Sequence, residues 1–309
     1  MSAKKSGSRR EFLATLALTS STLALRPASL LGAESPGRAA WPIGVFGKVY
    51  QELTLSFDES AEVTAAVGLD GIDCPVRPGG QVVPERAQDD LPRYAAALQQ
   101  RQRRVLLLTT AIVSAGSPHA ETILRTAGKV GVKYYRTGYW NYGKNSAPEA
   151  TLREIKAQLK DLAAMNQALG TCAILQNHAG TGLVGAKLLD YWELVKDFDP
   201  KHIAVAFDVG HALNELPDTW REVFKTMQSH VKVAYVKDFK RGAGFVPFGQ
   251  GSIGQTNFFE LLRKASYDAP LSMHIEYPWA DRGKKPSQAA LIQAMQGDLR
   301  TLKGWLRAA

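Results

Sequence analysis

The stretch Ile203-Ala-Val-Ala-Phe-Asp-Val-Gly-His211 decides how the rest of the chain is read. An unbroken apolar run leads directly into Asp208, and His211 follows after Val-Gly. Such a run predicts a strand that is buried on both faces, as in a parallel sheet covered by helices. Parallel α/β folds place their chemistry at the C-terminal ends of these strands, so both polar residues are functional candidates. The plainer alternative is that Asp208 caps the next turn and His211 only packs.

Strand-like segments alternate with helix-like segments along the rest of the chain. The predicted strands are 41–46, 71–76, 105–110, 134–138, 172–177, 203–208, 231–237 and 271–277. The predicted helices are 59–67, 84–102, 118–130, 148–169, 183–196, 219–229, 257–264 and 286–306. These alternations predict a single α/β domain, a (β/α)8 TIM barrel over residues 34–309. A doubly wound open sheet is the alternative, but its Gly-rich phosphate turn is missing after the first strand.

Residues 1–33 have the three parts of an export signal. Lys4 and Lys5 begin it, and Arg9-Arg10 precede a moderately apolar run and small residues at 32–33. The paired arginines predict a twin-arginine signal and a periplasmic or secreted protein. An ordinary secretory signal or a membrane anchor are the alternatives, but the apolar run is too short to span a bilayer. No later stretch is apolar enough either, so we expect no stable membrane insertion.

The charge of the chain does not favour nucleic-acid binding. The formal net charge is +9, and residues 1–33 carry five basic residues against one acidic residue. The remaining basic residues are scattered among acidic ones, unlike a nucleic-acid-binding surface. Cys74 and Cys172 lie in separate predicted strands, so two buried thiols are expected in preference to a disulfide. The sequence indicates no oligomeric state.

Polar residues cluster at the predicted strand ends. Side chains two residues apart on a strand share a face, so one barrel mouth is expected to gather Arg136, Gln176, His178, Asp208, Tyr235, Lys237, His274 and Glu276. Charges at this density must pair with each other, bind a metal or hold a polar ligand. A closed salt-bridge network is the alternative to a functional site. The Gly-rich loop 242–254 is expected to lie over this mouth, either as a substrate cover or as a mobile surface loop.

These motifs together resemble the xylose isomerase-like TIM-barrel superfamily. The resemblance covers the chain after residue 33 and rests on Asp208-Val-Gly-His211, Lys237-Asp238 and Glu276. Gln176-Asn-His178 and Gly249-Gln-Gly251 also fit. This superfamily includes sugar-phosphate isomerases and epimerases, inosose dehydratases and endonuclease IV. The exported subgroup with a twin-arginine signal is the narrower resemblance.

The resemblance implies one divalent metal, either manganese or magnesium, or alternatively zinc. Family members hold it through Glu, Asp, His and Glu, which correspond here to Gln176, Asp208, Tyr235 and Glu276. The amide of Gln176 carries no charge, and a tyrosine is a poor ligand unless it is ionised. The expected metal ligands are therefore Gln176, Asp208 and Glu276, with weak or absent binding. His178 or His274 could supply a nitrogen ligand instead.

The resemblance also implies an isomerase, an epimerase or a lyase that removes a proton next to a sugar carbonyl. Glu276 or His178 is the expected base, Lys237 or Arg136 the expected oxyanion stabiliser, and Asp208 a further catalytic residue. The expected substrate is a free sugar or keto-sugar. An exported protein would meet few phosphorylated sugars, because these are mainly cytoplasmic. The expected substrate-binding residues are Arg136, His211, Tyr235, His274 and Trp140, the last from the aromatic loop 139–142.

Two other functions compete with this expectation. A non-catalytic sugar-binding barrel with a degenerate metal site is the first, and the departures at Gln176 and Tyr235 motivate it. DNA repair of the endonuclease IV type is the second. It needs a trinuclear zinc site, and the six histidines of this chain are too dispersed to form one.

Overall fold

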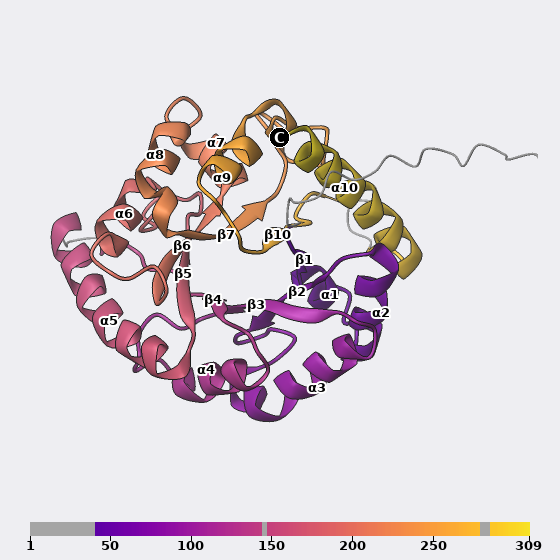
Figure 1. The fold of residues 1–309 in the computed structure, drawn as a ribbon, viewed down its shortest axis with the longest axis horizontal. Coiled ribbons are helices and arrows are strands. Elements are labelled where there is room, and N and C mark those ends of the chain that lie inside the picture. The colour runs from indigo at the N-terminus through magenta and orange to yellow at the C-terminus, as the bar shows by residue number, and fades with distance from the viewer. Residues whose placement is uncertain (1–40, 144–146, 279–284) are drawn as a thin grey trace, which may run out of the picture. The chain divides into compact units, whose positions relative to one another are not determined.

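Eight parallel strands close into a barrel in the computed structural model, which describes residues 41–143, 147–278 and 285–309. The strands lie in the order β1-β10-β7-β6-β5-β4-β3-β2, and the helices surround them (Figure 1). The predicted TIM barrel is therefore confirmed. The predicted signal at 1–33 lies outside the described residues.

All eight predicted barrel strands form, with small differences at their ends. They are β1 (Ile43–Phe46), β2 (Gly71–Val76), β3 (Arg104–Thr110), β4 (Tyr134–Arg136), β5 (Cys172–Gln176), β6 (Ile203–Asp208), β7 (Val231–Val236) and β10 (Leu271–Met273). A separate two-stranded sheet follows β7 and consists of β8 (Phe239–Lys240) and β9 (Gly244–Phe245).

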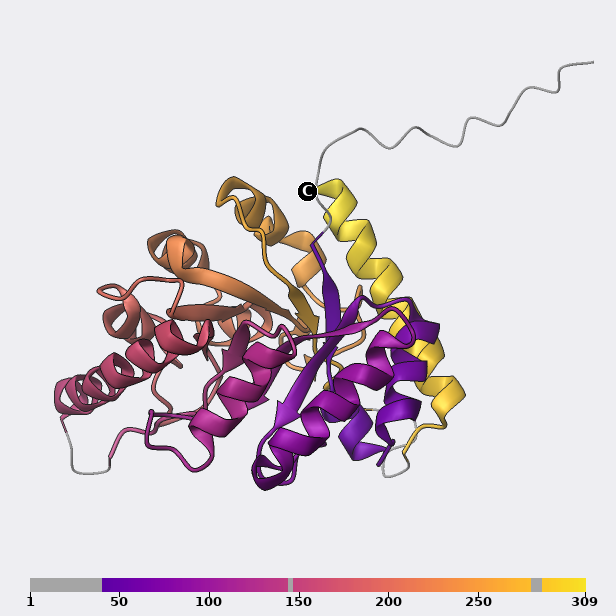
Figure 2. The ribbon, with the colours of Figure 1, turned by 60° about the horizontal axis from the view of Figure 1, so that its bottom comes forward.

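The helices that cover the barrel follow the predicted segments, with two additions. They are α1 (Lys48–Glu52), α2 (Phe57–Val67), α3 (Ala87–Gln99), α4 (Ala120–Lys129), α5 (Pro148–Leu169), α6 (Leu189–Val195), α7 (Val209–Glu215), α8 (Trp220–Met227), α9 (Phe258–Lys264) and α10 (Gln288–Ala308). Neither α1 nor α7 was predicted, because each is a short helix packed directly after a strand. Figure 2 shows α10 beside α2, where Gln296 Nε2 donates to the Ala66 carbonyl at 2.9 Å.

Local sequence explains where α2 begins and where α5 begins and ends. Ser56 caps α2 in a reciprocal capping box with Glu59. Pro148 opens α5, and Gly170 ends it with a left-handed φ of 69°, which a residue without Cβ adopts without strain. These signals are local, and that is why the ends of α5 match the predicted segment.

The apolar core has two layers. A small cluster fills the barrel interior with Leu106, Leu107, Cys172, Ile174, Ala204, Ala206, Val233 and Tyr235. A much larger cluster lies between the strands and the surrounding helices. The alternation of side chains along each strand separates the two layers. Cys74 and Cys172 are buried free thiols, as predicted.

The loop after β7 is organised by one carboxylate. Asp238 Oδ2 accepts the N–H groups of Gly249 and Gly251, both at 2.9 Å, and its Oδ1 accepts that of Ile253 at 3.1 Å. A side chain at Gly251 would place Cβ 2.3 Å from Asp238 Oδ1, so glycine is required there. The loop predicted as 242–254 is thus tied to the end of β7.

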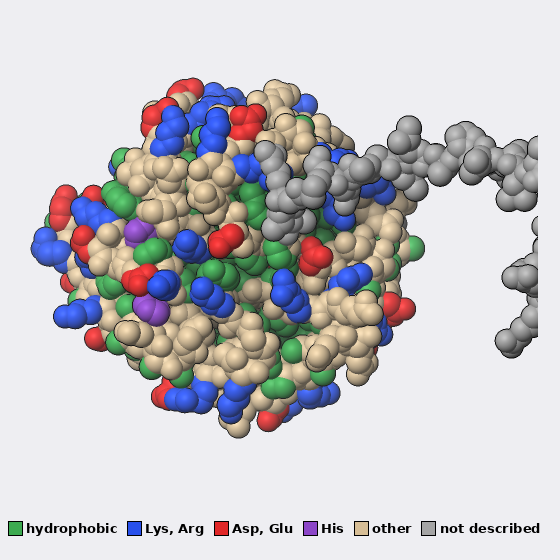
Figure 3. Space-filling view, viewed as in Figure 1, with side chains coloured by type: hydrophobic (Ala, Val, Ile, Leu, Met, Phe, Trp, Pro, Cys, Tyr) green, Lys and Arg blue, Asp and Glu red, His purple; other side chains and the backbone are tan. Residues whose placement is uncertain are grey.

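The surface gives no sign of a single large basic region on the face in view. Figure 3 shows lysine and arginine side chains interspersed with acidic ones on that face. Among the described helices, none is both long enough and apolar enough to cross a membrane.

Candidate active site

A small polar cavity of about 140 Å³ opens at the C-terminal ends of the strands. Its lining includes six of the predicted site residues, namely Arg136, Gln176, His178, Lys237, His274 and Glu276. Asp208 and His211 lie directly beneath, with 0% and 3% of their surfaces exposed. Alternation along the strands therefore predicted this set. The cavity is smaller than the 300–1,000 Å³ typical of sites for drug-sized ligands, so it suits a small polar molecule.

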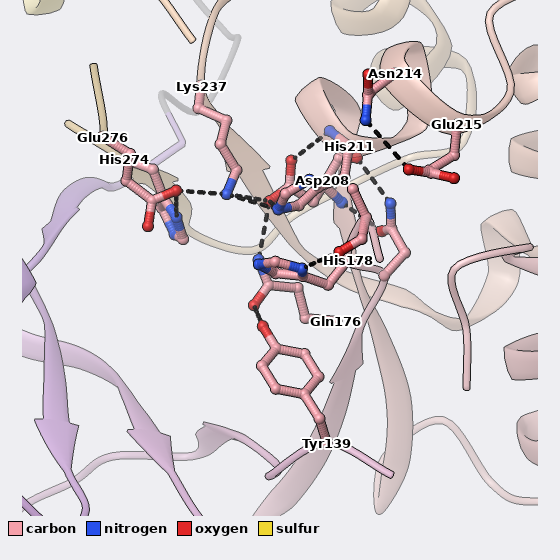
Figure 4. A network of polar contacts seen from close by, with 12 residues as sticks. Tyr139, Gln176, His178, Asp208, His211, Asn214, Glu215, Lys237, His274 and Glu276 are labelled. Carbon is pink, nitrogen blue, oxygen red and sulfur yellow. Dashed lines mark hydrogen bonds and ion pairs between the residues drawn. The ribbon is translucent and has the colours of Figure 1, made fainter. Parts of the chain in front are cut away.

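The ammonium group of Lys237 is the centre of the site. Its Nζ lies 2.7 Å from Glu276 Oε2, 3.0 Å from His211 Nε2 and 3.2 Å from Asp208 Oδ2. Figure 4 shows this nitrogen between Glu276 on one side and the Asp208–His211 pair on the other. An ammonium has three N–H donors and no acceptor, so these three neighbours use its full donor capacity.

The pKa shifts around Lys237 favour a charged lysine, two ionised carboxylates and a neutral His211. Burial opposes ionisation of Asp208 and Glu276, but nearby cationic groups outweigh it and hold both carboxyl pKa values below their usual range. Burial also opposes the ammonium of Lys237, yet these two carboxylates keep its pKa above the ordinary value. Burial lowers the pKa of His211 to about 3, so its Nε2 is neutral and accepts from Lys237.

Asp208 is held by Asn177, which follows the neighbouring strand β5, and by the helix α7 that it caps. Its backbone N–H donates to Asn177 Oδ1 at 2.7 Å, and Asn177 Nδ2 donates to the Asp208 carbonyl at 2.9 Å. Its side chain accepts the N–H of His211 at 3.1 Å and begins α7. Asp208 therefore caps α7, as the plainer alternative held, and its side chain also contacts Lys237.

Gln176 acts as a bridge in a chain of hydrogen bonds. Its Nε2 donates to Asp208 Oδ2 at 2.8 Å, and its Oε1 accepts from Tyr139 Oη at 2.7 Å. Tyr139 in turn lies under the guanidinium of Arg136, whose carbon is 4.6 Å from the ring centre. The amide thus gives a donor to one neighbour and an acceptor to the other, which a carboxylate cannot do.

His178 faces the cavity with one nitrogen fixed. Its Nδ1 lies 2.7 Å from the Ala179 carbonyl, which can only accept, so Nδ1 carries the proton. The lone pair of the neutral ring is therefore on Nε2. Burial lowers the pKa of His178 below its ordinary value, which keeps the ring neutral near pH 7. A neutral imidazole with a free lone pair beside a polar cavity is suited to accept a proton.

His274 is almost fully buried and lies at the cavity wall. Its ring stacks on Phe46 and lies 4.5 Å, centre to centre, from Tyr235. Neither of its ring nitrogens has a hydrogen-bond partner among the described residues, and Nδ1 is 3.9 Å from Glu276 Oε2. A polar ligand in the cavity would give this ring a partner.

Three predicted substrate-binding residues do not line the cavity, and the first is His211, which lies beneath it. Tyr235 is fully buried in the barrel interior with its ring against that of His274, because it lies on β7 one inward-facing position before Lys237, which directly follows the strand. Trp140 packs in the outer core and donates to Gln158 Oε1 at 3.4 Å. The aromatic residue that the loop after β4 contributes to the cavity is Tyr139, its immediate neighbour.

The predicted set omitted Lys48 and Arg77, which also line the cavity. Lys48 begins α1 just after β1 and lies 3.6 Å from Glu276 Oε1. Arg77 follows β2 directly, and its guanidinium carbon is 5.5 Å from the centre of the Phe46 ring. Each is the first cationic residue after a barrel strand, and this position in the sequence could have identified both as cavity residues.

A divalent metal does not fit among these residues as they stand. The space between the two carboxylates and His211 holds the Lys237 ammonium, and Gln176 turns its N–H group toward Asp208. No cluster of three His, Cys, Asp or Glu side chains in the described part of the chain is arranged to hold a metal. The strand-seven side chain beside Asp208 and Glu276 is Lys237 and not Tyr235, which lies deeper.

The barrel is similar to several solved structures. D-psicose 3-epimerase from Clostridium cellulolyticum, determined with D-tagatose, has a TM-score of 0.65 and 15% identity over 86% of this chain and 99% of that chain. The 3-keto-D-glucoside 4-epimerase of E. coli has a TM-score of 0.63 and 16% identity over 87% of this chain and 100% of that chain. A xylose isomerase-like TIM barrel protein from Mycobacterium smegmatis, in complex with magnesium, has a TM-score of 0.59 and 13% identity over 86% and 98%. At these identities the likeness concerns the fold.

Sequence comparison gives the family. A comparison with curated protein sequences found no match. The model of the xylose isomerase-like TIM barrel family matches residues 61–303, which include every barrel strand except β1 and all the predicted site residues. The chain belongs to the xylose isomerase-like TIM barrel family.

Proposed function

We propose that this protein is a sugar isomerase- or epimerase-like enzyme, or a related lyase, that removes a proton next to the carbonyl of a small sugar or keto-sugar. The observation that carries the proposal is His178, a neutral base with a fixed tautomer, beside a cavity lined by cations. The epimerase neighbours of the fold support the substrate class.

The cationic groups of the cavity suit the charge that such a reaction develops. Removing a proton next to a carbonyl places negative charge on the carbonyl oxygen, and preorganised donors stabilise it. Arg136, Arg77 and Lys48 present this positive charge at the cavity wall. In the proposed reaction Nε2 of His178 takes the proton, and these groups bind the oxyanion together with the ring of His274, which makes no hydrogen bond to a described residue.

The residues favour one-sided proton removal over two-base epimerisation. The position expected for a second carboxylate is Gln176, whose amide cannot usefully take up a proton. Glu276 is ionised, but its hydrogen bond to Lys237 and its lowered pKa make it a weak base. Elimination or isomerisation through His178 is therefore the proposed chemistry, and no step in it uses a metal.

Deuterium exchange tests this proposal. Purified protein incubated with 2-keto- and 3-keto-sugars in D2O is expected to exchange one carbon-bound proton or to release water, as followed by proton NMR and mass spectrometry. His178→Gln is expected to reduce the rate about 100-fold or more, within the range for loss of a general base. The acid limb of the pH–rate profile is expected below pH 6.5, because only the neutral ring is active and its pKa is lowered.

His119→Asn is the matched control for this experiment. His119 is exposed at the start of α4 with a φ of 59°, which asparagine tolerates, so the rate should not change. An unchanged rate in His178→Gln would assign the base to another residue.

A non-catalytic sugar-binding barrel is the second candidate. The closed hydrogen-bond chain through Tyr139, Gln176 and Asp208 favours it, since a satisfied network serves binding as well as catalysis. Calorimetric binding of a keto-sugar with no proton exchange would select this candidate.

We also propose that the chain is exported to the periplasm or secreted through the twin-arginine route. The paired arginines at positions 9 and 10, before the apolar run, support this localisation.

A further inference from the structure

The three partners of the Lys237 ammonium are the side chains that hold metal ions in proteins. Asp208 and Glu276 supply carboxylate oxygens, and His211 supplies a neutral imidazole nitrogen. Carboxylate and imidazole groups together bind manganese, zinc and related divalent ions. All three lone pairs point at one nitrogen atom, at 2.7 to 3.2 Å. The same three atoms would surround a cation at 2.0 to 2.2 Å after inward movements of about 1 Å or less.

Lys237 cannot leave this position easily. It is 1% exposed, and its ammonium lies 4.9 Å from the centre of the Phe245 ring on β9. Gly210 of α7 packs against its stem so closely that a Cβ there would lie 2.7 Å from Lys237 Cγ. The lysine is therefore enclosed from the helix side and from the loop side. A metal ion and the ammonium exclude each other sterically and by charge.

We propose that Lys237 is a built-in replacement for a divalent metal, and that it covers a latent metal site formed by Asp208, His211 and Glu276. The ammonium supplies a fixed positive charge between the two carboxylates at the floor of the cavity. Native protein then binds no divalent ion there, and removal of the amine exposes the ligands. The inference concerns cation binding alone, so it stands or fails independently of the proposed reaction.

Metal titration of Lys237→Ala tests the inference. Lys237→Ala leaves Asp208, which is fully buried, and Glu276, whose side chain is 19% exposed, without the ammonium between them. These carboxylates should then attract a dication, because a buried charge that has lost its partner is costly. Titration with Mn2+, by calorimetry and by loss of the free-ion paramagnetic resonance signal, should show one site. We expect its affinity to be about 100-fold or more above that of the native protein, and Mn2+ should raise the melting temperature of this variant only.

Two further variants make the result specific. Lys48→Ala removes another lysine that contacts Glu276, at 3.6 Å, but it is partly exposed and does not fill the space between the ligands, so it should gain no site. Asp208→Asn combined with Lys237→Ala removes one ligand and should abolish the gain.

Native protein provides an independent decision if Lys237→Ala does not fold. At millimolar Mn2+, native protein and Asp208→Asn should bind the same amount of Mn2+, because Lys237 blocks the site in both proteins. Stoichiometric Mn2+ binding by native protein through Asp208 would overturn the inference. A folded Lys237→Ala protein with no gain in affinity would overturn it as well.

Discussion

Two buried aspartates show how strongly one neighbour determines the ionisation of a side chain. Asp208 is fully buried, yet the cation at 3.2 Å holds its pKa below the usual range. Asp298 is 3% exposed, and no described lysine, arginine or histidine forms an ion pair with it. It accepts the Phe248 N–H at 3.0 Å and the Tyr277 hydroxyl at 2.8 Å, but burial still raises its pKa to about 6. The folded state therefore favours the protonated form of Asp298.

We expect Asp298→Asn to change the pH dependence of stability. The folded pKa is about 6 and the ordinary value is 3.8, so the stability from Asp298 is present at low pH and is lost as the pH rises through 6. The free energy of unfolding of native protein, relative to Asp298→Asn, should fall by about 1 to 2 kcal/mol between about pH 5 and pH 8. Urea unfolding at several pH values measures this difference. A constant difference would mean that the carboxyl titrates normally.

The Asp208-Val-Gly-His211 motif is best understood as a junction between two elements. Asp208 ends β6 and caps α7, and His211 projects from the first turn of that helix toward Lys237. Gly210 lets α7 approach the end of β7, since a Cβ there would lie 2.5 Å from the Lys237 carbonyl oxygen. The glycine is thus needed for close packing between a helix and a strand.

Gly210→Ala should therefore destabilise the protein, although alanine is the better helix former. The clash with Lys237 should lower the free energy of unfolding by about 1 to 3 kcal/mol, as overpacking does. Gly304→Ala in α10 is the matched control, because nothing lies within 4 Å of a Cβ there. That change should leave the protein equally stable or more stable by up to about 1 kcal/mol. Chemical unfolding measures both, and equal effects would show that Gly210 is not restricted by packing.

The order of strands in the whole barrel creates the site. β5, β6, β7 and β10 are neighbours, so Gln176, Asp208 and Lys237 meet Glu276 across the cavity although about 100 positions separate the first from the last. Parallel strands place all these residues at the same end. Figure 4 shows that the resulting contacts join residues from separate strands.

One prediction concerns the twin-arginine signal predicted at residues 1–33, which lies outside the described residues. A receptor reads the arginine pair, and lysine lacks the planar guanidinium of arginine. Arg9→Lys with Arg10→Lys should therefore retain the protein in the cytoplasm of a bacterium that has twin-arginine export. Cell fractionation measures this, with Lys4→Arg and Lys5→Arg as the control that keeps the charge. Normal export of the arginine-pair variant would contradict the predicted route.

The sequence alone determined the barrel, its strands and the side chains that face its mouth. Apolar runs, helix caps and alternation along strands are local, so 71–76, 203–208 and 148–169 match the predicted segments. The contacts of Lys237 were decided only by the tertiary structure. Tyr235 on β7 and Lys237 directly after it point to the same side, and alternation cannot say which of them reaches the layer of Asp208 and Glu276. Strand stagger in the closed barrel sets that depth, and it placed an ammonium where the family resemblance implied a metal.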